Sequence, residues 1–527
     1  MQIKLLALYF LMLLQASLSA YAQQPNVVWL DLEDLSPILS MYGDSSIETP
    51  HIDRLAREGI TFTKAYATVG VCAPSRFSII TGMFPVSLGG HNMRITAKNP
   101  FAVNGVPEYE VVPPPHVRCF PDLLREKGVY TVCSRKTDYQ FSPSPFTWDF
   151  VEKSDETDRY RFNYPQPFFK QINFWETHES QIWDWCRQNL PILIDSSRIK
   201  VPPYLPQTPV TRMDWITQYN NLKYVDDKIG RILDALEKGG ELENTIIIFT
   251  GDHGNGLPRG KRTVYESGVK VPMIIRYPDK RLAGTRNDYP VYLMDLGPTI
   301  LSMYGIATPA YMHGRDVVGT FNPGTPRQYL FFSADRFDEQ YDIIRGVRND
   351  HYKYIRNFQP QKPQFLNISY RKQQEGVRDL YRLDSLNQLG SLAKNVMRKT
   401  KPTEELYDLI NDPYELYNLA GDPRYRDIRN DLRLALDDWM QEVKDMGFTP
   451  EKDIAERFWP GGIQPVTATP EIKIQNNQLK MFCSTPGAII GFRKKGGTRW
   501  NIYTQPVNVK KGEEIEVMAQ RLGYKGS

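Results

Sequence analysis

The segment NTIIIFTGDHG, residues 244–254, indicates the fold class because it joins an apolar strand to a group of polar side chains. A continuous β-branched and aromatic run is typical of a strand that is covered on both faces of a parallel sheet. Before it, residues 213–240 repeat apolar side chains at helical spacing and end in a glycine pair. After it come another apolar strand, 271–278, and a helix, 294–305. This alternation predicts an α/β fold with a mostly parallel sheet flanked by helices.

The upstream part of the chain shows the same alternation. PNVVWLDLED (25–34) predicts a strand that ends in carboxylates, and IDRLAREG (52–59) predicts a helix closed by glycine. FPDLLREKG followed by YTVCSR (120–135) predicts a helix that leads into a strand, and QPFFKQINF (166–174) predicts a further strand. We therefore assign residues 23–325 to one α/β domain.

The pattern of the sequence changes after this domain. Between residues 328 and 357 the chain alternates polar and apolar side chains, as antiparallel strands do, and residues 430–447 predict an amphipathic helix. We assign residues 326–460 to a smaller antiparallel α+β subdomain. Short strands separated by turns follow, so residues 465–527 are predicted to form a small all-β module.

The N-terminus has the features of a signal peptide. MQIK carries a positive charge, the apolar run at residues 5–14 is too short to span a bilayer, and a small-residue cleavage site follows Ala22. We therefore predict a signal peptide over residues 1–22, a periplasmic or secreted protein, and no transmembrane segment. The net charge of +4 and the lack of a Lys/Arg block argue against nucleic acid as a partner.

Cysteine usage singles out one residue. The chain has five cysteines, so in an oxidising compartment at least one stays outside any intramolecular disulfide. The other four could be buried thiols or form two bridges. Cys72 lies in VCAPSRFSIITG (71–82), where Pro74 suits the first turn of a helix and Arg76 projects from the same face. A helix N-terminus favours a bound anion, so this segment is a candidate anion site.

The motif C-x-P-S-R followed by T-G resembles the sulfatase signature, in which the cysteine is converted to formylglycine (3-oxoalanine). Other segments are similar to sulfatases and come in the family's order: PNVVWLDLEDLSP, TPHIDRLAREGITFTKAYA, TGDHG, KRTVYESGVKVPMIIRYP and ELYDLINDPYELYNLAGDP. The resemblance is to the formylglycine-dependent sulfatases of the alkaline phosphatase superfamily, in the branch of heparan N-sulfatase and marine polysaccharide sulfatases. It implies an alkaline-phosphatase-like fold, with 23–325 as the catalytic domain. It also implies a formylglycine-generating or sulfatase-maturating enzyme as a partner that converts Cys72.

The resemblance implies a calcium site and a set of catalytic residues. Ca²⁺ would be held by Glu33, Asp34, Asp252, His253 and the modified Cys72. Carboxylate oxygens are the ligands that Ca²⁺ prefers. The remaining catalytic positions that the resemblance carries over are Arg76, which would hold the formylglycine hydrate, Lys136 and Lys261, which would neutralise sulfate oxygens, and His178, which would act as general acid.

This sequence departs from the family pattern at two positions. Glu33 stands where the family usually has aspartate, and it keeps the charge. Asp138 stands where the family often has histidine, so it cannot serve as a cationic clamp on sulfate; it would act as an acid or contact a substrate hydroxyl. His91 and Arg94, in GGHNMR, could line the substrate pocket or be structural.

The sequence therefore predicts an exported sulfatase that acts on a sulfated carbohydrate. The substrate would be a polysaccharide or its oligosaccharides, of the ulvan, carrageenan or glycosaminoglycan type, and hydrolysis of an N-sulfate is as open as that of an O-sulfate. Two alternatives remain: a phosphodiesterase or phosphonate hydrolase of the same superfamily, and a catalytically inactive glycan-binding protein.

Overall fold

The structure is a computed structural model that describes residues 24–95, 105–134, 136–152, 158–187 and 190–527. The signal peptide predicted over residues 1–22 lies outside these residues. Among the helices described, none combines the length and the apolar character needed to cross a membrane. All five cysteines lie in the described part of the chain, and each is a free thiol.

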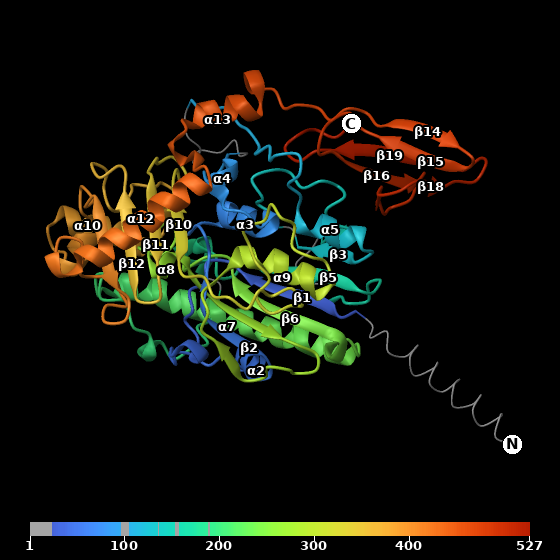
Figure 1. Cartoon of the computed structure of the whole chain (residues 1–527). Coiled ribbons are helices and arrows are strands. Elements are labelled where there is room, and N and C mark those ends of the chain that lie inside the picture. The colour runs from blue at the N-terminus through green and yellow to red at the C-terminus, as the bar shows by residue number, and fades with distance from the viewer. Residues whose placement is uncertain (1–23, 96–104, 135, 153–157, 188–189) are drawn as a thin grey trace.

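A nine-stranded sheet of the described residues forms the middle of the molecule (Figure 1). The strand order is β4-β3-β5-β1-β6-β7-β2-β8, and β9 also pairs with β2. The strands from β4 to β6 in this order run parallel, whereas β7 runs antiparallel to both of its neighbours. The strands are β1 (Asn26–Leu32), β2 (Ile60–Tyr66), β3 (Tyr130–Cys133), β4 (Phe150–Val151), β5 (Phe168–Phe174), β6 (Thr245–Gly251), β7 (Lys270–Arg276), β8 (Thr285–Asn287) and β9 (Val291–Tyr292).

Helices cover both faces of this sheet. Val28 of β1 and Ile247 of β6 pack in one apolar cluster with Leu222 of α7, whereas their sequence neighbours Val27 and Ile248 pack in a second cluster with α3, α5 and α9. Alternating side chains of a strand point to opposite faces, so the two clusters are the two covered faces. The helices of this domain are α2 (Pro50–Glu58), α3 (Cys72–Thr81), α4 (Pro85–Leu88), α5 (Phe120–Glu126), α6 (Asp184–Arg187), α7 (Pro209–Lys238), α8 (Glu266–Val269) and α9 (Leu296–Met303).

The register of β1 and β6 sets the position of the candidate site. Leu32 lies opposite Gly251 in the parallel pair, so both strands end at the same edge of the sheet. The polar residues that follow the strands therefore lie together at this edge. An edge formed by the carboxyl ends of parallel strands is where α/β sheets bind ligands.

A second, antiparallel sheet packs beside the first. Its order is β10-β11-β12-β13, and its apolar face shares a cluster with α12 and with Cys72 of α3. The elements of this region are β10 (Leu330–Ala334), β11 (Ile344–Arg348), β12 (Tyr352–Asn357), β13 (Glu404–Asp408), α10 (Glu375–Ser385), α11 (Ser391–Val396), α12 (Arg426–Glu442) and α13 (Glu451–Phe458). Short 3-10 helices join the elements of both regions: η1 (Ser40–Tyr42), η2 (Asp158–Tyr160), η3 (Glu179–Ile182), η4 (Ser196–Arg198), η5 (Leu242–Asn244), η6 (Leu293–Asp295), η7 (Arg371–Gln373), η8 (Pro423–Tyr425), η9 (Met446–Phe448) and η10 (Pro460–Gly462).

The C-terminal module, drawn in red in Figure 1, lies beside α5 and β3. The ring of Trp500 contacts Phe146 at 5.7 Å between centroids, and Arg499 forms an ion pair with Asp149 at 2.7 Å. The module consists of two small antiparallel sheets, β14-β15-β18 and β17-β16-β19. Its strands are β14 (Glu471–Gln475), β15 (Gln478–Phe482), β16 (Ile489–Lys494), β17 (Asn501–Ile502), β18 (Val507–Asn508) and β19 (Ile515–Gln520).

The predicted fold class is confirmed: a mostly parallel sheet between helices is followed by an antiparallel subdomain and a terminal all-β unit. The domain boundaries stay predictions. The helix predicted over 430–447 corresponds to α12, which begins and ends earlier than predicted, and α13 and η10 follow it.

Candidate active site

Cys72 is the first residue of α3. Val71 before it is extended, with φ −154° and ψ 148°, and Gly82 ends the helix with φ 68°. Every residue of α3 is buried, and Cys72 is 1% exposed. The Ser75 hydroxyl donates a hydrogen bond to the carbonyl of Asp252 at 2.6 Å, which ties the first turn of the helix to the loop after β6.

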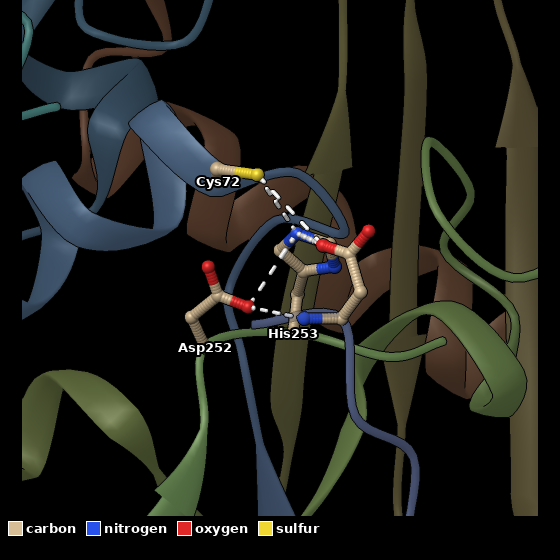
Figure 2. Close-up of side chains that lie close together, drawn as sticks. Cys72, Asp252 and His253 are labelled. Atoms are coloured by element: carbon tan, nitrogen blue, oxygen red, sulfur yellow. Dashed lines mark hydrogen bonds and ion pairs between the residues drawn. The ribbon is translucent and has the colours of Figure 1, made fainter. Parts of the chain in front are cut away.

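Four side chains from three distant segments converge at Cys72: those of Asp34, Asp252, His253 and Cys72 itself, with ligand atoms within 4.8 Å of one another. Figure 2 shows the Cys72 sulfur pointing from its helix toward the His253 ring. The Sγ atom lies 3.3 Å from His253 Nε2 and 3.9 Å from Asp34 Oδ1. His253 Nε2 also lies 3.1 Å from Asp34 Oδ1.

This group fits a hard divalent cation. His253 Nδ1 lies 2.8 Å from the carbonyl oxygen of Gly254, which can only accept, so Nδ1 carries a proton. In the neutral ring the lone pair of Nε2 then faces the carboxylates of Asp34 and Asp252. A positive charge is needed between this nitrogen and the carboxylate oxygens. Burial alone would lower the pKa of His253, but these carboxylates outweigh it and raise the pKa well above its usual value. A cation held by carboxylate oxygens and this nitrogen would supply the missing charge.

Arg76 joins two carboxylates beside this group. Its guanidinium donates to Asp31 Oδ2 at 2.6 Å and to Asp252 Oδ2 at 3.0 Å, and all three side chains are buried. Asp31 also accepts a hydrogen bond from Gln171 at 2.9 Å. Arg76 therefore fixes the orientation of Asp252, and Asp31 is its counterion.

Glu33 lies next to the four-residue group but faces a lysine. Its carboxylate accepts a hydrogen bond from Lys136 Nζ at 3.0 Å, and Lys136 also forms an ion pair with Asp138 at 3.2 Å. Burial would lower the pKa of Lys136, but Glu33 and Asp138 raise it above its usual value, so the amine stays charged. Ligand atoms of Glu33, Cys72 and His178 form a second group that overlaps the first at Cys72. Glu33 thus lies close to Cys72 but is not part of the four-residue group that contains Asp34.

His178 is the N-cap residue directly before the 3-10 helix η3 and accepts the backbone N–H of Ser180 on Nδ1 at 3.2 Å. The neutral ring therefore carries its proton on Nε2, which lies 3.9 Å from Glu33 Oε2. Burial and the nearby Lys261 ammonium lower the pKa of His178 to about 3. This imidazole is neutral at ordinary pH and can donate a hydrogen bond from Nε2.

Lys261 lies between two carboxylates. Its Nζ atom is 2.9 Å from both oxygens of Asp34 and 3.0 Å from Glu179 Oε1. Burial would lower the pKa of Lys261, but Asp34 raises it well above its usual value. Glu179 in turn accepts two hydrogen bonds from Arg262, at 2.8 and 2.9 Å.

Glu179 and Arg262 are site residues that the sequence analysis missed. The only sequence signal is adjacency: each directly follows a candidate catalytic residue, His178 and Lys261 respectively. Arg262 has a φ of 73°, a conformation that costs free energy in a non-glycine residue and that collects at functional sites.

His91 and Arg94 take different positions. His91 is 2% exposed and is buried near Asp335 and Arg345, so it lies against the antiparallel subdomain. Arg94 pairs with Asp338, and its guanidinium lies 4.4 Å from the centre of the Tyr370 ring, which contacts His178. Of the two, only Arg94 is connected to the candidate site.

Comparisons with known proteins identify the class. A family model described as Sulfatase matches residues 25–183 and 155–306, more than half of the chain. A model described as "N-sulphoglucosamine sulphohydrolase, C-terminal" matches residues 251–402, and one described as "Chitobiase/beta-hexosaminidase C-terminal domain" matches residues 461–525. The chain belongs to the sulfatase family and is a sulfuric ester hydrolase, which confirms the resemblance stated from its motifs.

Two relatives and one solved structure are similar over most of the chain. An ulvan-active sulfatase of Formosa agariphila is 37% identical, over 96% of this chain and 90% of its own length. Human N-sulphoglucosamine sulphohydrolase is 26% identical, over 80% of this chain and 91% of its own length. A solved structure described as a complex with its substrate D-glucosamine-2-N,6-O-disulfate covers 81% of this chain and 99% of its own, with a TM-score of 0.57 and 19% identity. The last of these supports the fold alone.

Proposed function

We propose that this protein is an exported, calcium-dependent sulfatase that removes sulfate from a sulfated polysaccharide or its oligosaccharides. Cys72 would be converted to formylglycine by a maturation enzyme. The observation that carries the proposal is the convergence of Cys72, Asp34, Asp252 and His253 at one sheet edge, beside the buried Lys261 and the partly exposed Lys136. A thiol with no catalytic role would not need this arrangement of charge.

The side chains have distinct roles in this proposal. When bound, calcium would polarise sulfate oxygens, and hydrated formylglycine would supply a nucleophilic hydroxyl. Asp34, Asp252 and His253 would hold the cation, and Arg76 would keep Asp252 in position. The N-terminus of α3 would favour the sulfate anion.

The remaining groups act on the substrate. Lys136 and Lys261 stay charged and would neutralise sulfate oxygens as negative charge develops. His178 would donate a hydrogen bond from Nε2 to the leaving oxygen. Asp138 pairs with Lys136 and would orient that lysine or contact a substrate hydroxyl. Arg94 would lie at the outer edge of the pocket, beside Tyr370.

The substrate class follows from the relatives. The 37% identity to an ulvan-active sulfatase extends over nearly the whole chain, which favours a sulfated polysaccharide. The match of residues 251–402 to the C-terminal region of an N-sulphoglucosamine sulphohydrolase keeps an N-sulfate as a second candidate.

The first test is the mass of the peptide that contains residue 72, from protein made in a host with sulfatase-maturation activity. We expect a loss of about 18 Da relative to the thiol, because sulfur is replaced by oxygen and hydrogen is lost. Sulfate release is then measured on ulvan oligosaccharides, carrageenan oligosaccharides and N-sulfoglucosamine, with Cys72→Ala as the control.

Two outcomes contradict the proposal. An unmodified thiol together with undiminished sulfate release would exclude the formylglycine mechanism. Full activity after exhaustive chelation, with no further gain on adding Ca²⁺, would exclude the calcium site. The phosphodiesterase alternative is tested on the same preparation, by comparing kcat/KM on an aryl sulfate and an aryl phosphodiester.

A further inference from the structure

A cleft of about 650 Å³ borders the loops that carry Asp34 and His253. Ser36 and Asn255, each two positions after one of these residues, form part of its wall. None of the candidate site residues described above lines it. Its volume is in the range of sites that hold small organic ligands.

The carboxylates of the cleft already have partners. Glu266 pairs with Arg348 at 2.9 Å and with Lys353 at 2.8 Å. Asp44 accepts hydrogen bonds from the Tyr219 hydroxyl and from the backbone of Ser46. Glu415 accepts the backbone N–H of Glu266 at 2.8 Å and lies 3.5 Å from Lys353.

Two lysines of the cleft are not engaged in this way. Within the part of the chain that the structure describes, the amines of Lys200 and Lys270 have no hydrogen bond and no ion pair within 4.0 Å. Lys270 is partly buried, and burial lowers its pKa, since Glu266 only partly offsets the loss of water. An anion in the cleft would restore the interactions that its ammonium gives up. Arg259, by contrast, is committed to the carbonyls of Tyr414 and Glu415.

Aromatic rings form much of the remaining wall. Tyr204 and Tyr414 contact each other edge to face at 6.1 Å between centroids, and Tyr414 is 47% exposed. Trp215 and Tyr219 of α7 also line the cleft, with their ring centroids 6.3 Å apart. Tyr204 is buried, and the Arg259 guanidinium lies 4.7 Å from the centre of its ring, so Tyr414 offers the exposed ring of this pair. An exposed ring in a cleft that also holds uncommitted ammonium groups suits a ligand that has both an apolar ring face and negative charge.

We propose that this cleft is a second, non-catalytic site that binds an anionic saccharide, with its acid group at Lys200 and Lys270 and its ring against the exposed ring of Tyr414. The acid group is a sulfate or a carboxylate. This site would hold a sugar while the Cys72 site carries out hydrolysis. Binding of the sugar in the cleft does not depend on which type of bond the Cys72 site hydrolyses.

The test is isothermal titration of the Cys72→Ala protein, which cannot turn over its ligand. The probes are a chondroitin 6-sulfate disaccharide, the neutral disaccharide cellobiose and inorganic sulfate. The test variant is Lys200→Gln/Lys270→Gln, and Tyr414→Ala removes the exposed ring separately. Lys511→Gln is the matched control, because Lys511 is exposed in the C-terminal module and does not line the cleft. Thermal melting shows that each variant is folded.

We expect the chondroitin disaccharide to bind at a site whose affinity falls at least tenfold in the double lysine variant and falls in Tyr414→Ala, but is unchanged in Lys511→Gln. When the two lysine substitutions are introduced into the matured protein that retains residue 72, kcat/KM for an aryl sulfate should equal that of the matured protein without them. Equal binding of the disaccharide by the parent and the double variant would overturn the proposal.

The other probes separate the parts of the proposal. Cellobiose binding as tight as that of the charged disaccharide overturns the role of the lysines, and sulfate binding as tight overturns the role of the rings. If the Cys72→Ala protein binds one disaccharide per chain and the double lysine variant binds none, the disaccharide occupies the cleft and not the Cys72 site, which supports the proposal. If the double lysine variant still binds one disaccharide per chain, the disaccharide occupies only the Cys72 site, which overturns the proposal.

Discussion

Glu179 lies buried between Lys261 and Arg262, and its charge keeps both cations in place. We expect Glu179→Gln to destabilise the protein by about 1–3 kcal/mol, because Lys261 keeps Asp34 and Arg262 keeps Asp338, but each buried cation loses a charged partner. We also expect kcat to fall, since Lys261 would turn toward Asp34 alone. Melting temperature, kcat and Ca²⁺ affinity measure these effects.

The matched control for this prediction is Glu243→Gln. Glu243 is 70% exposed at its side chain and lies 3.4 Å from Arg276, so its loss should change stability by less than about 1 kcal/mol. Unchanged kcat and Ca²⁺ affinity in Glu179→Gln would show that the residue is not a positioning residue.

His178 gives the protein a dependence on pH. Its pKa is about 3 in the folded chain, because of burial and Lys261, against a usual value of 6.5. Between these values the unfolded chain binds up to about one more proton than the folded chain, so stability is present above pH 6.5 and is lost as the pH falls. We expect His178→Gln to flatten the decline of the urea midpoint between pH 6.5 and pH 4. Parallel profiles of wild type and variant would contradict the low pKa.

The sequence located the residues whose type and motif are distinctive, and it did so through family resemblance. Cys72, Asp252 and His253 fall in short motifs that can be read locally. Glu179 could not be found this way, because its partner Arg262 lies far along the chain and only the fold joins them. The partner of the Glu33 carboxylate could not be predicted either. It accepts a hydrogen bond from Lys136, and the fold alone brings these two residues together.

At the scale of elements, α7 supports the sheet through one apolar face. Leu222 is fully buried against that face, so Leu222→Ala should cost about 2–5 kcal/mol through lost burial and the cavity left behind. The urea midpoint should fall, whereas Leu434→Ala on α12 should leave it nearly unchanged, because Leu434 is 62% exposed. Equal shifts in the two variants would contradict the role assigned to this face.

The elements that could be predicted are those with strong periodicity or long apolar runs. The helix predicted over 213–240 is α7, which begins earlier, at Pro209, where Thr208 accepts the backbone N–H of Thr211. The short strands β4, β8 and β9 went unpredicted, because two or three residues carry no period and pairing with neighbours defines them. Helices α10, α11 and α13 were also missed, although α10 and α13 are amphipathic once their limits are known.

In the whole molecule, the C-terminal module packs on the α/β domain through apolar, aromatic and ionic contacts, and its Leu522 lies in the same apolar cluster as α5. Trp500 meets Phe146 and also stacks under the Arg493 guanidinium at 4.3 Å. We expect Trp500→Ala to loosen this packing and to speed cleavage by protease in the segment before β14. Phe482→Ala, at a side chain 61% exposed on β15, should leave the cleavage rate unchanged. Equal rates in the two variants would mean that other contacts hold the module.

The burial of α3 limits the time at which Cys72 can be modified. Cys72 is 1% exposed, and its neighbours on the helix are covered by both the α/β domain and the antiparallel subdomain. On the proposed function, a maturation enzyme would have to reach Cys72 before the subdomain folds over it, because the folded chain leaves this segment almost no exposed surface. Maturation and folding would then compete for the same residues, and a chain that folded first would keep an ordinary thiol.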